Sequence, residues 1–155
     1  LYPDGKYGER SYANVAAVLS AETGDAGMYE FVRRLVFSVV IGNADMHLKN
    51  WSLLYPDDRT PALSPAYDFV STTAYIPEDS LALSFGGSKS LTEITQDQVR
   101  RFAETARVPM KPVWNLARET ADQVKRAWRK LEQKKVLPVK LRRAIDAQIA
   151  AVTVE

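Results

Sequence analysis

The chain has 155 residues, of which 46% are hydrophobic and 26% charged, a composition that suits one globular domain with a sizeable apolar core. It contains no cysteine and one histidine, so disulfide frameworks, thiolate catalysis and metal sites built from cysteines or several histidines are excluded within it. The longest apolar run, residues 35–41, is too short to span a bilayer and no signal peptide is visible, so we expect a cytoplasmic protein without a membrane partner.

The charge sums to only +2, but it is unevenly placed along the chain. Residues 1–110 carry 10 basic and 14 acidic side chains, whereas residues 111–143 carry 11 basic and 3 acidic ones. A basic block of this kind fits the solvated faces of amphipathic helices, and it leaves open a nucleic acid or an acidic protein as partner.

The first third of the chain predicts two helical segments. Residues 1–6 do not begin with Met and are rich in turn formers, so we expect a fragment of a longer protein. Ser11 precedes apolar residues spaced as one helix face over residues 12–19, which predicts an N-cap. Gly24 and Gly27 interrupt this pattern. Apolar residues at three-four steps over residues 28–40 then predict a central, largely buried helix.

A polar segment, residues 41–50, separates this helix from a predicted β-hairpin. Residues 51–55 and 62–64 indicate its two short strands, with a turn rich in Pro and Asp between them. Residues 64–87 contain Pro, Ser and Gly without periodicity, which predicts an ordered loop.

Three helices are predicted in the C-terminal part. Thr95 and Gln98 form a capping-box pattern that opens the first, while Pro112 and Pro138 open the second and third. The expected inward-facing residues are Val99, Phe102, Ala103 and Ala106 in the first helix, Trp114, Ala117, Ala121, Val124, Trp128 and Leu131 in the second, and Leu141, Ile145 and Ile149 in the third. The basic residues Lys125, Arg126, Arg129, Lys130, Lys134 and Lys135 are expected to be solvated. The predicted fold class is therefore mainly α with one small β-hairpin.

The polar segment carries the groups that phosphoryl transfer requires. Such a reaction needs an acid to orient and deprotonate the attacking hydroxyl, oxygen ligands for Mg²⁺, and a cation to offset the developing charge. Asp45, Lys49 and Asn50, followed after the hairpin by Asp68, supply these groups. The interval from Asp45 to Asn50 equals that of the protein-kinase catalytic loop, and Asp68 with Phe69 stands where kinases carry a metal-binding Asp-Phe-Gly.

These motifs resemble the HipA family. The sequence GNADMHLKNWSLL at residues 42–54 resembles its catalytic loop, LSPAYD at residues 63–68 its metal-binding segment, and LALSFGG at residues 81–87 the stretch that follows. A weaker similarity covers residues 6–19. The resemblance as a whole therefore runs from about Lys6 to the helix around Phe102. Met46 stands where many family members have a polar residue.

The resemblance implies a serine/threonine protein kinase, the toxin of a bacterial toxin–antitoxin system, with a kinase-like fold of two lobes. It implies a protein substrate of the aminoacyl-tRNA synthetase type and a HipB-like antitoxin that contacts DNA, so that DNA is only an indirect partner. Residues 1–155 then correspond to the helical C-terminal lobe, whose hairpin carries the catalytic and metal-binding loops. Neither a Gly-rich phosphate loop nor a strand lysine precedes the catalytic loop, so the ATP site is expected to be incomplete in this fragment and the fragment inactive alone.

The resemblance also assigns roles to individual residues. Asp45 is the catalytic base, while Asn50 and Asp68 bind Mg²⁺ and with it the ATP phosphates. Lys49 neutralises phosphate charge or steadies the loop. His47 supports the loop by hydrogen bonding, with direct proton transfer as the alternative. The side chains of Asp45, Asn50 and Asp68 are expected to converge on one polar cleft.

Other interpretations remain open at this stage. Asn43 is expected to shape the loop rather than bind a ligand, and Tyr67 to be a packed aromatic rather than a nucleotide contact. Residues 95–135 could form a DNA-binding pair of helices with a basic second helix. A third possibility is a helical module without catalytic activity that docks an antitoxin or a missing N-terminal lobe.

Overall fold

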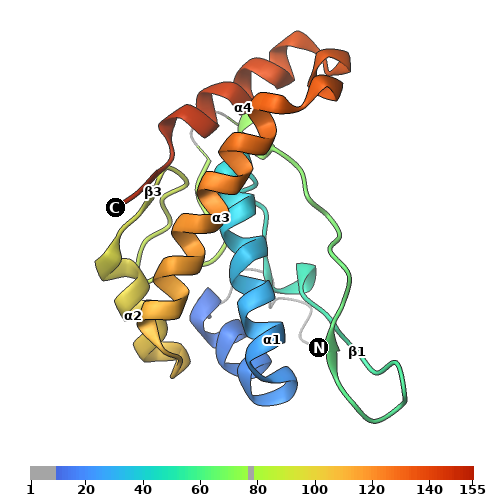
Figure 1. The fold of residues 1–155 in the computed structure, drawn as a ribbon, viewed down its shortest axis with the longest axis vertical. Coiled ribbons are helices and arrows are strands. Elements are labelled where there is room, and N and C mark those ends of the chain that lie inside the picture. Colours follow the sequence, from blue (N-terminus) through green and yellow to red (C-terminus); the bar gives the residue numbers. More distant parts are fainter. Residues whose placement is uncertain (1–9, 77–78) are drawn as a thin grey trace.

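The computed structural model describes residues 10–76 and 79–155 (Figure 1). The turn-rich residues 1–6 and part of the predicted loop at residues 77–78 lie outside these ranges. Within them the α-helices are α1 (Tyr12–Ile41), α2 (Gln96–Ala106), α3 (Met110–Lys130) and α4 (Val139–Ala151). Short 3-10 turns are η1 (Leu48–Asn50), η2 (Thr72–Ala74) and η3 (Glu132–Val136). The prediction of a mainly helical fold is confirmed.

Four short strands form two small sheets in the part of the chain that the structure describes. The predicted hairpin is present, with β1 (Leu53–Leu54) antiparallel to β2 (Ala62–Leu63). A second sheet, in which β3 (Glu93–Ile94) runs parallel to β4 (Thr153–Val154), was not predicted. Each of its strands has only two residues and its partners are far apart in sequence, so neither carries an alternating pattern that could indicate it.

Helix α1 forms the centre of the fold and has the predicted break. The backbone N–H of Ser11 donates to Oδ1 of Asn14 over 2.8 Å, which closes the first turn. Gly24 has φ 66° and ψ −164°, so the helix is kinked there. The segment after the kink supplies much of the core, since Met28, Phe31, Val32, Leu35, Val36, Val39 and Val40 are all buried. Helices α2, α3 and α4 all contact α1, and Figure 1 shows α3 alongside it.

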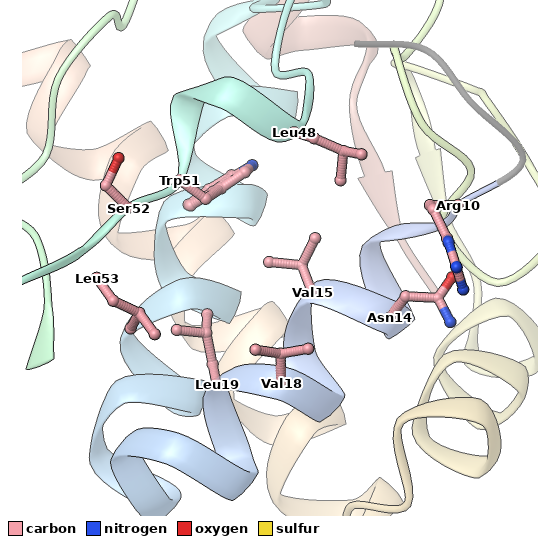
Figure 2. A pocket seen from close by; sticks show the side chains of 9 residues that line it. All are labelled: Arg10, Asn14, Val15, Val18, Leu19, Leu48, Trp51, Ser52 and Leu53. Atoms are coloured by element: carbon pink, nitrogen blue, oxygen red, sulfur yellow. The ribbon is translucent and has the colours of Figure 1, made fainter. Parts of the chain in front are cut away.

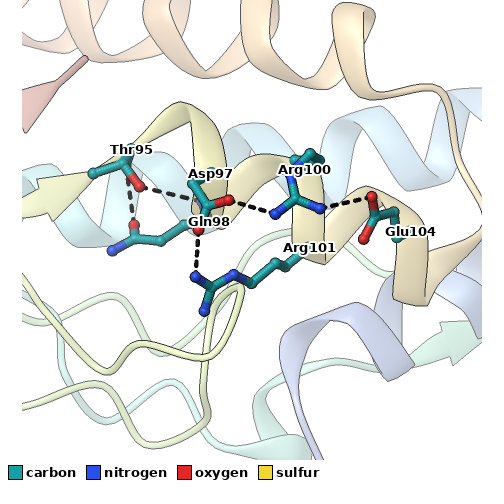
Figure 3. Close-up of polar contacts among 6 residues, drawn as sticks. All are labelled: Thr95, Asp97, Gln98, Arg100, Arg101 and Glu104. Carbon is teal, nitrogen blue, oxygen red and sulfur yellow. Dashed lines mark hydrogen bonds and ion pairs between the residues drawn. The ribbon is translucent and has the colours of Figure 1, made fainter.

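Helix α2 begins with the predicted capping box. The N–H of Gln98 donates to Oγ1 of Thr95 over 3.2 Å, and the N–H of Thr95 donates to Oε1 of Gln98 over 3.1 Å. Figure 3 shows this cap beside surface ion pairs that join Arg100 to Asp97 and Glu104. Exposed pairs of this kind contribute little to stability, so the cap and the predicted buried face hold the helix.

Two details of the C-terminal helices differ from the prediction. Helix α3 begins at Met110 rather than Pro112, because a proline is tolerated in the first turn, where its missing N–H has no helical partner. Leu131 was expected to face inward but is 40% exposed, since it follows the last helical residue and leaves the apolar face. Pro138 precedes α4 as predicted, and Ile145 and Ile149 are buried.

The basic residues of α3 and η3 are only partly solvated. Nζ of Lys125 donates to the carbonyl of Val152 over 2.6 Å, and Nζ of Lys134 donates to that of Trp128 over 2.7 Å. These amines therefore stabilise the ends of the helices, whereas Arg126, Arg129, Lys130 and Lys135 are exposed as predicted. No helix within the described ranges is long and apolar enough to cross a membrane.

Gln148 joins α4 to the end of α1. Its Nε2 donates to the carbonyls of Val39 and Leu91, over 2.9 and 2.6 Å, in a buried position. Gln148→Leu leaves the Leu91 carbonyl without this donor, and we expect it to lower the free energy of unfolding by about 1–3 kcal/mol. Urea denaturation measures this, with Gln123→Leu as the control because Gln123 is exposed and its side chain bonds, within the described residues, to Glu119 on the same helix. Equal losses in the two variants would contradict the prediction.

Candidate active site

The polar segment begins where Gly42 ends helix α1. Gly42 has φ 73°, a left-handed conformation, and a Cβ there would lie 2.3 Å from Oγ1 of Thr73. Its N–H donates to the carbonyl of Val39, and the N–H of Asn43 donates to that of Ser38. The buried helix therefore ends at a fixed point and presents residues 43–50 beside the loop that follows the hairpin.

The structure brings Asn50 and Asp68 into direct contact. Nδ2 of Asn50, in η1, donates to Oδ2 of Asp68 over 2.6 Å. Asp68 adopts φ 59°, which is uncommon for a residue other than glycine, and such backbone strain often occurs at functional sites. The buried side chain of Asn43 donates to the Asp68 carbonyl over 3.4 Å, which fits the loop-shaping role expected for it.

The donor set of this pair fits Mg²⁺. Oδ1 of Asn50 is buried and has no hydrogen-bond partner among the described residues, while the Asp68 carboxylate is exposed beside it. Mg²⁺ prefers oxygen ligands and commonly takes one or two from the protein and the rest from water and phosphate. Within the described residues no group of three His, Cys, Asp or Glu could hold a metal alone. The pair therefore fits a metal that is shared with a nucleotide.

Asp45 lies on the same segment as Asn50, but it lines a cavity to which neither Asn50 nor Asp68 contributes. This cavity has a volume of about 360 Å³ and is also lined by Thr72 and Asp79. The Asp45 carboxylate is exposed, whereas its neighbours Ala44 and Met46 are buried. The convergence of Asp45 with Asn50 and Asp68 on one cleft therefore stays a prediction, although the N–H of Ala44 bonds to the segment that carries Asp68, at Thr72.

His47 and Lys49 occupy contrasting positions. His47 is 6% exposed, its N–H donates to the Asp45 carbonyl over 3.0 Å, and its carbonyl accepts from the N–H of Asn50. Both are backbone bonds, so the role of the His47 imidazole stays a prediction. The side chain of Lys49 is exposed and free to reach an anion, so its role too stays a prediction.

Tyr67 was expected to be packed, and this is wrong. The side chain is 41% exposed, because its hydroxyl donates to the carbonyl of Lys49 over 2.9 Å and lies 2.7 Å from Oγ of Ser52 at the surface. Tyr67, which directly precedes Asp68, therefore links the Asp68 loop to η1.

Two supporting residues had no distinctive sequence pattern. Arg34 projects from α1, pairs with Glu30, and donates to the carbonyl of Ser64 over 2.6 Å, which holds the start of the Asp68 segment. Tyr12 is fully buried and its hydroxyl donates to the Met46 carbonyl over 2.9 Å. Burial raises the pKa of Tyr12 well above its usual value, and the nearby Asp45 charge adds to the shift, so the hydroxyl remains a donor. The spacing of Glu30 and Arg34, four residues apart on one helix, could have predicted their ion pair. Neither the Arg34–Ser64 contact nor the Tyr12–Met46 contact has such a signal in the sequence.

A second cavity of about 430 Å³ lies between the start of α1 and residues 48–53. Figure 2 shows aliphatic side chains along its walls, with Arg10 and Asn14 at one end and Trp51 and Ser52 across from them. Neither Asp45 nor Asp68 lines it. Because none of the described residues that line it carries a carboxylate, we place the candidate active site at the Asp45, Asn50 and Asp68 group instead.

The fold matches that of a HipA toxin. A solved complex of HipA, HipB and operator DNA from Shewanella oneidensis contains a chain that superposes with a TM-score of 0.73 at 20% identity, covering 92% of this chain and 36% of that one. The chain also matches the family model described as "HipA-like C-terminal domain" over residues 1–128. It therefore belongs to the family of HipA-like C-terminal domains.

Curated relatives in the same family are named as kinases. The chain is 46% identical over its whole length to "Putative kinase Y4dM" of Sinorhizobium fredii, of which it spans 38%. It is 40% identical to "Putative kinase Y4mE" of the same organism over 59% of this chain and 23% of that protein. The chain thus spans well under half the length of the relatives it matches.

Proposed function

We propose that residues 1–155 are the C-terminal catalytic lobe of a HipA-like serine/threonine protein kinase, which transfers the γ-phosphate of ATP to a protein hydroxyl. The observation that carries this proposal is the contact between Asn50 and Asp68, 18 residues apart in sequence and 2.6 Å apart in space. Membership of the HipA-like family and the order of Asp45, Asn50 and Asp68 support it.

Each side chain then has a defined task. The exposed Asp45 carboxylate orients the acceptor hydroxyl and takes its proton, and the exposed amine of Lys49 offsets phosphate charge. Asn50 and Asp68 would hold Mg²⁺, which when bound neutralises charge on the nucleotide phosphates. His47 supports the backbone between Asp45 and Asn50.

The partners of the whole protein follow from the same proposal. The Shewanella oneidensis HipA was solved with HipB and operator DNA. By analogy we propose that a HipB-like antitoxin binds the protein in the cytoplasm and that DNA is contacted through that antitoxin. The aminoacyl-tRNA synthetase type of substrate rests on family resemblance.

A DNA-binding role for the helices of residues 95–135 has less support. Lys125 and Lys134 make intramolecular hydrogen bonds, so they are not presented as free phosphate contacts. Arg100 and Arg101 both pair with Asp97 (Figure 3).

Phosphoryl transfer is tested with the full-length protein and γ-labelled ATP in a bacterial extract, followed by phosphoamino-acid analysis. We expect label on serine or threonine of a protein, and none with Asp45→Asn. A folded protein that binds Mg·ATP but labels no protein, or labels only tyrosine, would contradict the proposal.

A polypeptide of residues 1–155 alone is expected to fold without acting as a kinase. An ATP site between two lobes has part of its walls outside this chain, which spans 38% of its relative Y4dM. We therefore expect no shift in melting temperature with Mg·ATP and no phosphoryl transfer. Thermal denaturation with and without Mg·ATP tests this, with the full-length protein as the control. Robust phosphorylation by the short polypeptide would contradict it.

A further inference from the structure

The residue before Asp45 is held by hydrogen bonds on both sides of its peptide. The N–H of Ala44 donates to Oγ1 of Thr72 over 3.0 Å, and its carbonyl accepts from the N–H of Ala82 over 2.9 Å. The Thr72 hydroxyl also donates to the carbonyl of Gly42 over 3.2 Å. One hydroxyl therefore fixes two points of the backbone that leads into Asp45.

The residue after Asp45, Met46, is held by a side chain from the start of helix α1. The carbonyl of Met46 accepts from the hydroxyl of Tyr12 over 2.9 Å, and Tyr12 is fully buried. The N–H of Tyr12 in turn donates to the carbonyl of Ser84 over 3.0 Å. The segment 82–84 thus supports both neighbours of Asp45, directly at Ala44 and through Tyr12 at Met46.

The Asp45 side chain itself is exposed, whereas Ala44 and Met46 on either side are buried. A carboxylate that accepts a proton must nevertheless lie within hydrogen-bond reach of the acceptor hydroxyl. The backbone on either side sets the point from which this carboxylate projects, so holding that backbone contributes to its position.

We propose that Thr72 and Tyr12 are positioning residues that hold Asp45 toward the acceptor hydroxyl, an inference that rests on the function proposed above. Neither residue takes part in the chemistry. Their hydroxyls fix the peptides of Ala44 and Met46, and so the point from which the carboxylate projects.

Three substitutions in the full-length protein test the proposal. Thr72→Val keeps the shape but neither donates nor accepts, Thr72→Ser keeps the hydroxyl, and Tyr12→Phe removes only the hydroxyl oxygen. We expect Thr72→Val and Tyr12→Phe each to lower kcat by roughly 10- to 100-fold, as small misplacements of catalytic groups do, with KM for Mg·ATP unchanged. Thr72→Ser should restore most of kcat.

Matched controls are available nearby. Thr73→Val removes a hydroxyl whose only side-chain hydrogen bond within the described residues, to Ser71, is 3.4 Å long. Tyr29→Phe removes a half-buried tyrosine hydroxyl from α1. Both are expected to keep the kcat of the unmodified protein.

Amide hydrogen exchange gives a readout that does not depend on kinase activity. We expect exchange at Ala44 in Thr72→Val to speed up by more than exchange at amides elsewhere in the core, because the Ala44 N–H loses its acceptor. Normal kcat in Thr72→Val and Tyr12→Phe, while Asp45→Asn is inactive, would overturn the positioning role and leave the proposed function intact. A fall in kcat accompanied by an equal rise in KM and global destabilisation would also overturn it. Faster exchange in a protein that transfers no phosphate in any form would overturn the proposed function, and with it the catalytic meaning of the two contacts.

Discussion

Asp45→Asn is expected to lower the rate of phosphoryl transfer by the full-length protein by roughly 10²–10⁴, the usual range for a general acid–base group. The substitution keeps the shape of the side chain but removes the carboxylate that accepts the hydroxyl proton. Because Asp45 is not part of the Asn50–Asp68 pair, the affinity for Mg·ATP should remain close to that of the unmodified protein. Initial rates and calorimetry with Mg·ATP measure the two quantities separately.

Asp79→Asn is the matched control for this prediction. Asp79 lines the same cavity as Asp45, and its carboxylate accepts from the N–H of Ser80 over 2.9 Å. The Asp79→Asn substitution therefore changes the charge of the cavity by the same amount as Asp45→Asn without removing the proposed base. Equal rate losses in the two variants would show that the charge of the cavity, rather than a proton acceptor at Asp45, controls the rate.

Local features of the fold were predictable because their signals lie within one helical turn. Ser11, Thr95 and Pro138 mark helix starts through bonds or steric effects that span three or four residues. The C-cap of α1 at Gly42, which is left-handed and close to Thr73, was not predicted. The meeting of Asn50 with Asp68 follows from the short hairpin, which returns the chain to the end of η1.

Long-range contacts could not be predicted from the sequence in the same way. The bond from Tyr12 to Met46 spans 34 residues, and that from Ala44 to Thr72 spans 28. Both are single hydrogen bonds from common residue types, so they produce no periodicity. The exposure of Leu131 likewise depends on where α3 ends. Leu131 is the first residue after the helix, so its side chain no longer lies on the apolar face of α3. The supporting residues of the candidate site therefore became visible only in three dimensions.

Asp68→Asn is expected to abolish phosphoryl transfer and also to weaken nucleotide binding in a Mg²⁺-dependent way. The new amide oxygen can still accept from Asn50, so the 2.6 Å contact and the fold persist, but the charge that would attract the metal is lost. Calorimetry with ATP, with and without Mg²⁺, should show a large loss of affinity only when Mg²⁺ is present. The resemblance to HipA toxins leads us to propose that the full-length protein arrests growth of a bacterial host, and both Asp45→Asn and Asp68→Asn should then relieve the arrest.

The matched control is Asp58→Asn. Asp58 is exposed in the turn of the hairpin and has φ 60°, close to the 59° of Asp68, so the two substitutions make the same change at nearly the same φ. Because asparagine tolerates the left-handed region at least as well as aspartate, neither variant should be destabilised by backbone strain. Asp58→Asn should bind Mg·ATP normally, which would assign the loss in Asp68→Asn to the metal ligand rather than to strain or net charge. If Asp68→Asn kept its Mg²⁺-dependent affinity while Asp45→Asn lost it, the base and the metal ligand would be the reverse of those proposed.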